Sequence, residues 1–257
     1  MQMITVGIDV GSITTKAAVA KDGVVIADKV VLTGYNAQAA GEKVFDEILK
    51  ESGIDRSSIE KIISTGYGRN SVTVTDKAVT EITCHAAGAY YLDPEVRSVI
   101  DIGGQDSKAI AVNDAGSPLD FAMNDKCAAG TGRFLEVMAG ALAVDLDNFG
   151  DWSLKAQHPS TISSLCTVFA ESEVISLISK GEKRENIIAG IHEAIAARTV
   201  AMANRVGFNP MIMMTGGVAK NMGVVRALEQ KIGQKIEVSE KSQVTGAIGA
   251  AMIAQRA

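Results

Sequence analysis

Two aspartates, each followed by a glycine turn and a lysine, occupy equivalent places in the segments 8–16 and 100–108. Asp9 and Lys16 align without a gap with Asp101 and Lys108. In both copies an apolar run leads into the aspartate and a second apolar run follows the lysine. Carboxylates are hard oxygen ligands suited to Mg²⁺, and glycine turns with free backbone N–H groups bind phosphate oxygens. The repeat therefore predicts two related hairpins around a magnesium-bound phosphate chain, whereas a single copy would indicate only a tight turn.

The turn residues of both hairpins supply donors for phosphate. Glycine lets phosphate oxygens approach the backbone, hydroxyl groups add donors, and the Lys16 ammonium places positive charge near the β- and γ-phosphates. Asp9 and Asp101 are the expected Mg²⁺ ligands, acting through water. The residues expected to bind the phosphate chain are Gly11, Ser12, Ile13, Thr14, Thr15, Lys16, Gly103 and Gly104.

A third segment predicts a contact with the adenosine part of a nucleotide. The apolar run 211–215 is expected to form a buried strand, and the segment 216–221 is a glycine turn that opens a helix. Such a turn presents helix N-terminal N–H groups and lets a flat ligand pass close to the backbone. Alone, the pattern would indicate only a strand–helix junction. The residues concerned are Gly216, Gly217, Val218 and Asn221.

Strands and amphipathic helices are mixed along the chain, which is typical of an α/β protein. We expect each half to form a mixed sheet flanked by helices. Strands are expected at 3–8, 14–20, 23–31, 59–64, 97–102, 107–113, 117–122, 211–215 and 235–238. Helices are expected at 37–52, 78–92, 130–142, 167–181, 185–206, 219–231 and 243–256. The first domain is expected to combine 1–95 with 243–257, and the second to span 96–242.

The composition is typical of a soluble globular protein. The 257 residues suffice for one large or two medium domains, and 47% of them are hydrophobic and 21% charged. A net charge of −5 gives no reason to expect nucleic acid or an anionic membrane as a partner. No apolar run approaches the ~18 residues of a membrane span, and the chain enters a strand at once, so we expect a cytoplasmic protein without a signal peptide.

Two of the three cysteines precede expected helices. Cys127 lies ahead of the helix 130–142, and Cys166 ahead of the helix 167–181. A thiolate at a helix N-terminus is stabilised by the helix dipole, which favours metal ligation or reactivity. An iron–sulfur cluster usually takes four thiolates, which a two-fold homodimer would supply from two per chain. From the residues alone, buried unreactive cysteines remain the alternative. Cys84, in mid-helix, is expected in the core, and an odd number of cysteines argues against a disulfide framework.

The motifs resemble those of two nested families. The hairpins and the glycine turn are similar to the ATP-binding motifs of the actin, Hsp70 and sugar-kinase superfamily, and the segment 243–251 resembles the closing helix of that fold. The segments 124–134, 166–176 and 65–70 are similar to the activator components of 2-hydroxyacyl-CoA dehydratases, most of all those of 2-hydroxyglutaryl-CoA dehydratases. The wider family includes the ATPase subunits of benzoyl-CoA reductases. The second resemblance extends over nearly the whole chain.

This resemblance implies two duplicated actin-like (ribonuclease H-like) domains that bind ATP or ADP with Mg²⁺, with Gly132 and Gln243 among the nucleotide contacts. It implies an oxygen-sensitive homodimer bridged by one [4Fe–4S] cluster, which Cys127 and Cys166 of each chain ligate. It also implies that ATP hydrolysis is coupled to the transfer of one low-potential electron to a 2-hydroxyacyl-CoA dehydratase. The electron donor would be a ferredoxin or a flavodoxin.

Catalytic roles differ between this mechanism and its rivals. In the activator mechanism Gln105, opposite the first hairpin, is our candidate for orienting the attacking water, with Asp9 and Asp101 on Mg²⁺. An ATPase subunit of a benzoyl-CoA reductase-type enzyme is the alternative within the family. Outside it, the alternatives are an actin-like scaffold and a small-molecule kinase of the same fold, with Asp106 or Asp125 as general base and structural cysteines.

Overall fold

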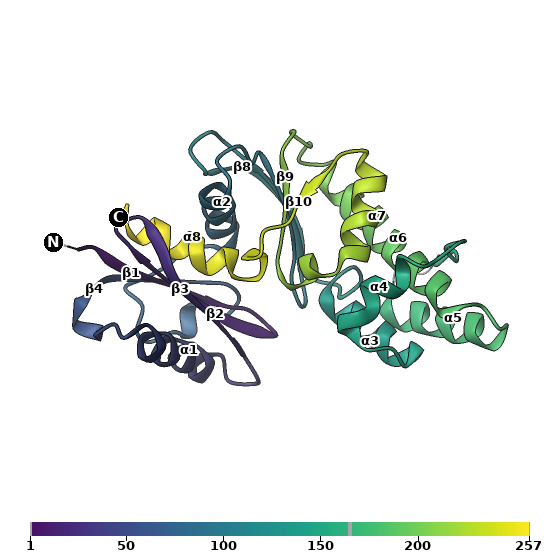
Figure 1. The fold of residues 1–257 in the computed structure, drawn as a ribbon, viewed down its shortest axis with the longest axis horizontal. Helices are drawn as coiled ribbons and strands as arrows, with labels where there is room; N and C mark the ends of the chain where they lie inside the picture. Colours follow the sequence, from purple (N-terminus) through teal and green to yellow (C-terminus); the bar gives the residue numbers. More distant parts are fainter. Residues whose placement is uncertain (1, 164–165, 257) are drawn as a thin grey trace.

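The computed structural model describes residues 2–163 and 166–256, which form two five-stranded mixed sheets (Figure 1). The first sheet has the order β3-β2-β1-β4-β5, and the second has the order β10-β9-β6-β7-β8. Taken from its other edge, the second sheet repeats the first: three strands joined as antiparallel hairpins, followed by two parallel strands. The expected α/β fold with one mixed sheet in each half is confirmed.

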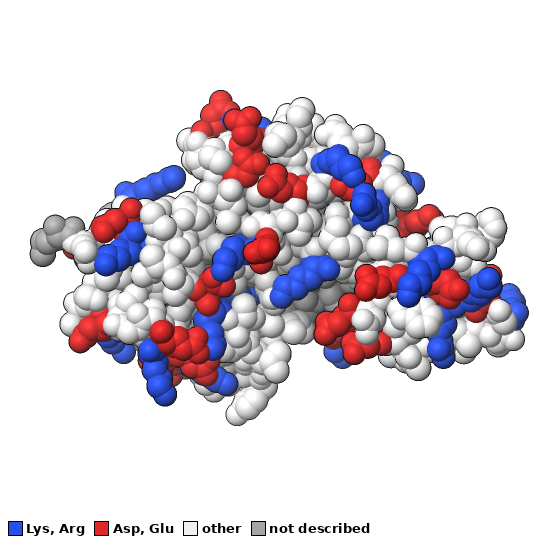
Figure 2. Space-filling model, in the orientation of Figure 1, with Lys and Arg blue, Asp and Glu red and all other residues white. Residues whose placement is uncertain are grey.

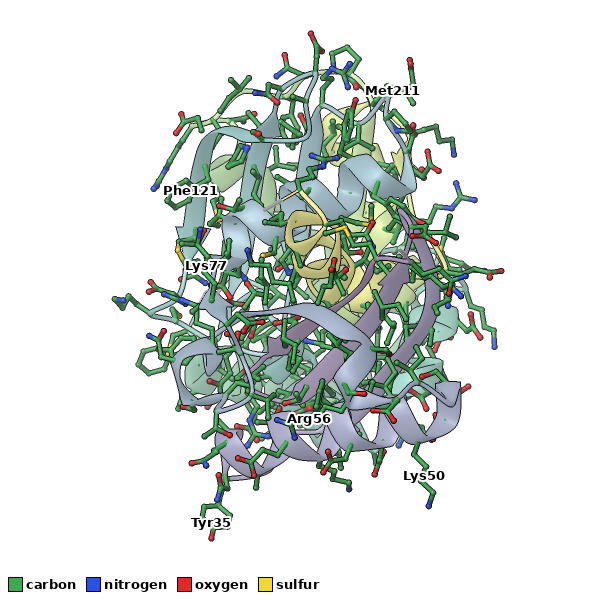
Figure 3. All side chains as sticks on the ribbon, turned by 90° about the vertical axis from the view of Figure 1, so that its left-hand side faces the viewer. Tyr35, Lys50, Arg56, Lys77, Phe121 and Met211 are labelled. Carbon is green, nitrogen blue, oxygen red and sulfur yellow. The ribbon has the colours of Figure 1, made fainter. Side chains whose placement is uncertain are left out.

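The strands of the first sheet are β1 (Ile4–Val10), β2 (Thr14–Lys21), β3 (Val24–Leu32), β4 (Ile59–Thr65) and β5 (Lys77–Ala78). Those of the second sheet are β6 (Ser98–Ile102), β7 (Ser107–Val112), β8 (Pro118–Asn124), β9 (Ile212–Thr215) and β10 (Ile236–Glu237). The edge strand β5 is not among the expected strands, and its second residue, Ala78, falls within the helix expected at 78–92. Figure 3 shows Lys77 of β5 and Phe121 of the other edge strand, β8, on the same side of the molecule.

The helices are α1 (Ala37–Ser52), α2 (Glu81–Leu92), α3 (Gly132–Leu142), α4 (Phe149–Ser153), α5 (Thr167–Ser179), α6 (Arg184–Ala203), α7 (Met222–Ile232) and α8 (Thr245–Ala254). Two of them, α2 and α7, begin three residues later than expected, at Glu81 and Met222. The side chains of Thr80 and Asn221 accept hydrogen bonds from backbone N–H groups there and so cap the helices. The short helix α4 is not among the expected helices. No helix of the described residues is long and apolar enough to cross a membrane.

Each hairpin places its aspartate directly opposite its lysine. All residues of β1 and of β6 are buried, so both strands lie inside their sheets. β1 pairs with β2 in the register that sets Asp9 against Lys16, and β6 pairs with β7 in the register that sets Asp101 against Lys108. Residues opposite each other on antiparallel strands have neighbouring side chains. The alignment of the two sequence copies is therefore also a structural equivalence.

Helices α2 and α8 cross at very close range and join the two halves. A methyl group on Gly249 of α8 would lie 1.7 Å from the carbonyl oxygen of Cys84, and one on Gly88 of α2 would lie 2.1 Å from that of Thr245. Only glycine permits this approach. α8 also packs on β1, and α2 also packs on β6 and β7 of the second sheet. The crossing thus fixes how the two sheets meet.

Each sheet has its own apolar core. In the first half β1, β2 and α1 enclose residues such as Ile8 and Phe45. In the second half the sheet and the helices α3 to α7 enclose a larger set that includes Ile100, Met138 and Phe149. Because the aromatic content is only 4%, these cores consist mainly of aliphatic side chains and methionine. The polar turns of the two hairpins are not part of these cores and lie where the two halves face each other.

We expect Gly249→Ala to lower the free energy of unfolding by about 1–3 kcal/mol or more, because the added methyl group overpacks the helix crossing. Gly140→Ala in α3 is the matched control, since a methyl group there meets no atom within 4 Å. Alanine favours a helix interior by about 0.5–1 kcal/mol over glycine, so the control should be at least as stable as the wild type. Equilibrium urea unfolding measures both. A Gly249→Ala protein with wild-type stability would contradict the close crossing.

Candidate nucleotide site

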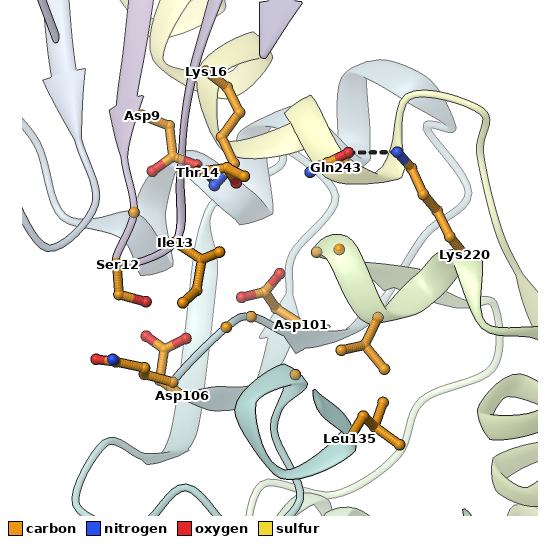
Figure 4. A pocket seen from close by; sticks show the side chains of 18 of the residues that line it. Asp9, Ser12, Ile13, Thr14, Lys16, Asp101, Asp106, Leu135, Lys220 and Gln243 are labelled. Atoms are coloured by element: carbon orange, nitrogen blue, oxygen red, sulfur yellow. Dashed lines mark hydrogen bonds and ion pairs between the residues drawn. The ribbon is translucent and has the colours of Figure 1, made fainter. Parts of the chain in front are cut away.

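The two hairpins, the glycine turn after β9 and the segment before α8 face one cleft of about 290 Å³ (Figure 4). Over the face drawn in Figure 2, basic and acidic side chains are interspersed rather than gathered into one broad field of a single sign. The lining includes most of the residues that the sequence singles out, namely Asp9, Gly11, Ser12, Ile13, Thr14, Lys16, Asp101, Gly103, Gly104, Gln105, Gly132, Gly216, Gly217, Val218, Asn221 and Gln243.

Thr15, also expected in this set, is not part of the lining. Successive side chains of a strand point to opposite faces, so Thr15 points away from the face that Thr14 and Lys16 share. Its hydroxyl group is buried and lies 2.9 Å from that of Thr33. Thr15 therefore supports the hairpin from behind instead of presenting a donor to the cleft.

The first hairpin brings a carboxylate and an ammonium group to the cleft. Lys16 Nζ lies 3.1 Å from Asp9 Oδ2, and the side chains are 14% and 6% exposed. The second hairpin touches the tip of the first, since a methyl group on Gly104 would lie 2.2 Å from Ile13 Cγ1. Glycine at this position lets the two turns meet. One ligand lying across both turns would therefore contact both halves of the protein.

The second hairpin holds its lysine far more tightly. Lys108 Nζ lies 2.7 Å from Asp106 Oδ2, 3.1 Å from Asp101 Oδ2 and 4.0 Å from Glu81 Oε2, and the side chain is only 2% exposed. Burial alone would lower the pKa of Lys108, but the three carboxylates hold it well above its usual range. Lys108 is thus a permanently charged structural residue. Lys16, with one carboxylate partner, is the better donor to phosphate.

Asp101 is a buried carboxylate that stays ionised. Thr215 Oγ1 donates to Asp101 Oδ1 at 2.9 Å, and His85 Nδ1 lies 3.4 Å from the same oxygen. Burial alone would raise the pKa of Asp101, but the His85 ring, the Lys108 ammonium and the Thr215 hydroxyl group hold it below its usual range. An ionised oxygen donor at this place is suited to Mg²⁺.

Glu81 and His85 line the cleft, although the sequence analysis does not select them. Both lie on α2, and burial raises the pKa of Glu81 despite the nearby Lys108. Their spacing of four residues places them on one helix face, which is a signal that the sequence contains. The neighbouring residue Cys84 lies in the core instead.

The glycine turn after β9 is required by its geometry. Gly216 has φ of 85°, and a methyl group there would lie 2.3 Å from the carbonyl oxygen of Ile102. Lys220 Nζ donates to Gln243 Oε1 at 2.5 Å, which joins this turn to the segment before α8 (Figure 4). The Oδ1 atom of Asn221 caps α7, so only its amide nitrogen remains free to reach a ligand or a neighbouring side chain.

The cysteines lie in three different environments. Cys84 is buried in the core, as expected, and burial raises the pKa of its thiol to about 12. Cys127 is half-buried in the loop between β8 and α3, and its carbonyl oxygen accepts a hydrogen bond of 2.7 Å from Asn124 Nδ2. Cys166 is exposed and is the N-cap residue of α5. Among the described residues, no group of three or more His, Cys, Asp or Glu side chains is placed to hold a metal ion.

The helix expected near 130–142 is α3, which begins at Gly132, so Cys127 lies ahead of a helix as expected but not at its N-terminus. The segment 128–131 separates them, because the start of α3 is tied to the second hairpin. Gly132 N donates to the Gly103 carbonyl oxygen at 2.9 Å, and Arg133 N donates to that of Gly104 at 2.8 Å.

A family model described as the BadF/BadG/BcrA/BcrD ATPase family matches residues 6–254. The chain belongs to this ATPase family. The match extends from β1 to the end of α8 and so includes both hairpins and the glycine turn.

Individual relatives are similar over nearly their whole length. The activator of lactoyl-CoA dehydratase from Anaerotignum propionicum is 48% identical, over 99% of this chain and 98% of its own. The crystal structure of component A of the (R)-2-hydroxyglutaryl-CoA dehydratase from Acidaminococcus fermentans has a TM-score of 0.95 at 46% identity, covering 99% of this chain and 98% of its own. The activator of the 2-hydroxyisocaproyl-CoA dehydratase from Clostridium difficile, with bound ADPNP, has a TM-score of 0.93 at 43% identity, covering 98% and 94%. The resemblance inferred from the sequence is confirmed.

In this ATPase, His192 of α6 lies in the core behind Asn221, which lines the cleft. Its Nε2 atom lies 3.4 Å from Asn221 Nδ2, its ring packs edge-on against Phe149 at 5.5 Å, and its Nδ1 atom has no hydrogen-bond partner. Burial lowers the pKa of His192 to about 3. The neutral ring accepts from the Asn221 amide and so fixes the side chain that caps α7.

We expect Lys16→Ala and Asp101→Asn to reduce kcat for ATP hydrolysis by about 100-fold or more, because each removes a charge that phosphate or Mg²⁺ needs. Lys21→Ala is the matched control, since Lys21 ends the same strand as Lys16 but lies outside the cleft lining. Steady-state phosphate release measures all three variants. Normal hydrolysis by Asp101→Asn would reduce the second hairpin to a structural element.

We expect His192 to make the ATPase less stable in acid. Its native pKa of about 3 lies below the unfolded value of about 6.5, so the unfolded chain alone binds a proton between these values. Stability is therefore lost as the pH falls through this window, by about 2 kcal/mol from pH 7 to pH 5 for this group. In urea unfolding at both pH values, His192→Asn should lose that part of the pH dependence, and the exposed control His158→Asn should keep it. Equal pH dependence in both variants would contradict the assignment.

Proposed function

We propose that this ATPase activates a 2-hydroxyacyl-CoA dehydratase by coupling ATP hydrolysis to the transfer of one low-potential electron from a [4Fe–4S] cluster. The observation that carries the proposal is the pair of hydrogen bonds from Gly132 N and Arg133 N to the carbonyl oxygens of Gly103 and Gly104. These bonds connect the phosphate-binding hairpin to the segment that carries Cys127. The names of the relatives, which are activators of three dehydratases, point to the same role.

Mg²⁺ and the nucleotide would be held between the two halves. Asp9 and Asp101 would bind the metal through water, and Lys16 would meet the phosphates. Gln105, which lines the cleft beside Asp101, would orient the attacking water. We also propose that the domains divide as 1–95 with 243–257 and 96–242, so that closure around ATP moves one hairpin toward the other. ATP can drive this closure only if it binds the closed state more tightly than the open one.

The thiols fit one half of a four-thiolate site. Cys127 and Cys166 are the two cysteines outside the core, and they flank the arm that carries α3 and α4. A cluster usually takes four thiolates, so Cys127 and Cys166 of two chains would hold one. Such a cluster supplies a one-electron reductant when it is bound. The chain itself would bind ATP and present this arm to a partner. Asn124 would hold the Cys127 loop through its hydrogen bond to the Cys127 carbonyl oxygen.

The surface of α5 supports a homodimer. Val168 and Phe169 are each 66% exposed, Ile175 is 55% exposed and Ile178 is 40% exposed. In α5 only Ala170 and Val174 are buried. Exposed apolar patches of this kind mark protein interfaces. A second copy seated here would cover them and bring its own Cys166 close to the axis of the dimer.

The proposed function leaves two partners to name, which are the acyl-CoA class of the dehydratase and the protein that donates the electron. Relatives at 43% to 48% identity are named for lactoyl-, 2-hydroxyglutaryl- and 2-hydroxyisocaproyl-CoA dehydratases. The proposal is therefore the 2-hydroxyacyl-CoA class of dehydratase rather than one member. We propose a ferredoxin or flavodoxin as the donor, because a low-potential cluster needs a low-potential one-electron reductant.

The rival functions have less support. A kinase needs a free general base, but Asp106 is bound to Lys108 at 2.7 Å. A hydrogen bond from Lys126 lowers the pKa of Asp125, which weakens it as a base. An ATPase subunit of a benzoyl-CoA reductase-type enzyme remains the alternative inside the family, and the choice of partner protein separates it from a dehydratase activator.

We expect anaerobically purified Cys127→Ser and Cys166→Ser proteins to lose most of their iron, whereas Cys84→Ser should keep the wild-type iron content. The reason is that Cys84 lies in the core, while the other two thiols are accessible to a shared cluster. Iron and sulfide quantitation, with the oligomeric state from light scattering, measures the outcome. Full iron content in Cys166→Ser would contradict the assignment of Cys166 as a cluster ligand.

The anaerobically purified wild-type protein tests whether nucleotide binding and the cluster are coupled. Coupling between two sites is reciprocal, so iron removal by a chelator should proceed at different rates with ADP, with an ATP analogue and without nucleotide. The dehydratase should in turn raise ATP turnover. Equal rates in all three states, together with a phosphorylated small-molecule product, would rule out the activator in favour of the kinase.

A further inference from the structure

His85 stands beside the carboxylate of the second hairpin and holds it through two contacts. Its Nδ1 atom lies 3.2 Å from Thr215 Oγ1 and 3.4 Å from Asp101 Oδ1. The Thr215 hydroxyl group donates its own proton to Asp101 Oδ1 at 2.9 Å, so its oxygen is left to accept from Nδ1–H. The Thr215 hydroxyl group therefore orients one oxygen of Asp101 and is itself held by the ring N–H of His85, while Lys108 binds the other oxygen.

The opposite edge of the His85 ring faces the first hairpin. A methyl group on Gly246 of α8 would lie 3.0 Å from His85 Nε2 and 3.0 Å from Asp9 Oδ2. Glycine keeps this space between the ring and the carboxylate open. Because α2 carries His85 and packs on α8, which in turn packs on β1, the helix pair sets the position of His85 relative to Asp9.

We infer that His85 is a positioning residue for the magnesium–nucleotide complex, which it serves by holding Asp101 in the orientation that faces Asp9. This inference rests on the proposed Mg²⁺ role of the two carboxylates. Nδ1 is the atom that carries it, because Nδ1 contacts Thr215 and Asp101. Side chains that orient the ligands of a metal typically change metal affinity by about 10- to 100-fold when they are removed.

Two substitutions separate the ring nitrogens. In His85→Asn the side-chain nitrogen is the same number of bonds from the backbone as Nδ1 of histidine. In His85→Gln the side-chain nitrogen is the same number of bonds from the backbone as Nε2. The affinity of the full chain for ADP, measured by calorimetry with and without Mg²⁺ at one pH, gives a ratio that reports the contribution of the metal. We expect His85→Asn to keep the wild-type ratio, and His85→Ala and His85→Gln to lower it by about 10- to 100-fold. Cys84→Ala, the adjacent buried residue of α2, is the control that should keep the ratio.

Thr215→Val gives an independent test that does not depend on whether His85→Ala folds. It should lower the ratio as much as His85→Ala does, and the double variant should be no worse than either, because both act through one contact. An unchanged ratio in His85→Ala or in Thr215→Val would overturn the inference. So would a His85→Gln protein that keeps the ratio while His85→Asn loses it. A wild-type protein whose ADP affinity is the same with and without Mg²⁺ would instead refute the metal role itself.

Discussion

The burial of two like-charged carboxylates on either side of one cleft is the constraint on which the rest of the structure depends. Asp9 and Asp101 are 4% and 2% exposed. A buried ion costs several kcal/mol unless hydrogen bonds and opposite charge surround it. Each hairpin meets this cost with a lysine directly across the strand pair. A shift of either register by one residue would turn the aspartate and its lysine to opposite faces, so the strand pairing and the charge pairing specify each other.

The two copies have diverged around this common device. In the first hairpin Lys16 has Asp9 as its ion-pair partner and lies on the cleft surface. In the second hairpin Lys108 is surrounded by three carboxylates and is almost sealed from solvent. Exchange of a carboxylate for a phosphate oxygen is easier where fewer contacts are lost. The duplication therefore yields one hairpin with an accessible lysine and one whose lysine is fixed by its neighbours, which suits the proposed closure around ATP.

Much of this site was readable in the sequence, because the two hairpins and the glycine turn are local patterns. The alternation of side chains along β2 also predicts that Thr15 points away from the cleft, although the expected ligand set included Thr15. The spacing of Glu81 and His85 on one helix face was also readable, but the contacts of His85 with Thr215 and Asp101 were not. They depend on how α2 packs on the second sheet, which is a property of tertiary packing. The same holds for the ties at the start of α3, whose first N–H groups bind carbonyl oxygens of the second hairpin.

These N–H groups also make the two outer cysteines unequal. The first two amides of α3 are given to Gly103 and Gly104, so they are not available to stabilise a thiolate at Cys127. Cys166 is instead the N-cap residue of α5 itself. In exchange, two hydrogen bonds link the second hairpin to the start of α3, so the proposed closure around ATP would also move the segment that follows Cys127. A nucleotide between the hairpins would thus act first on the Cys127 side of the proposed cluster and only through helix packing on the Cys166 side.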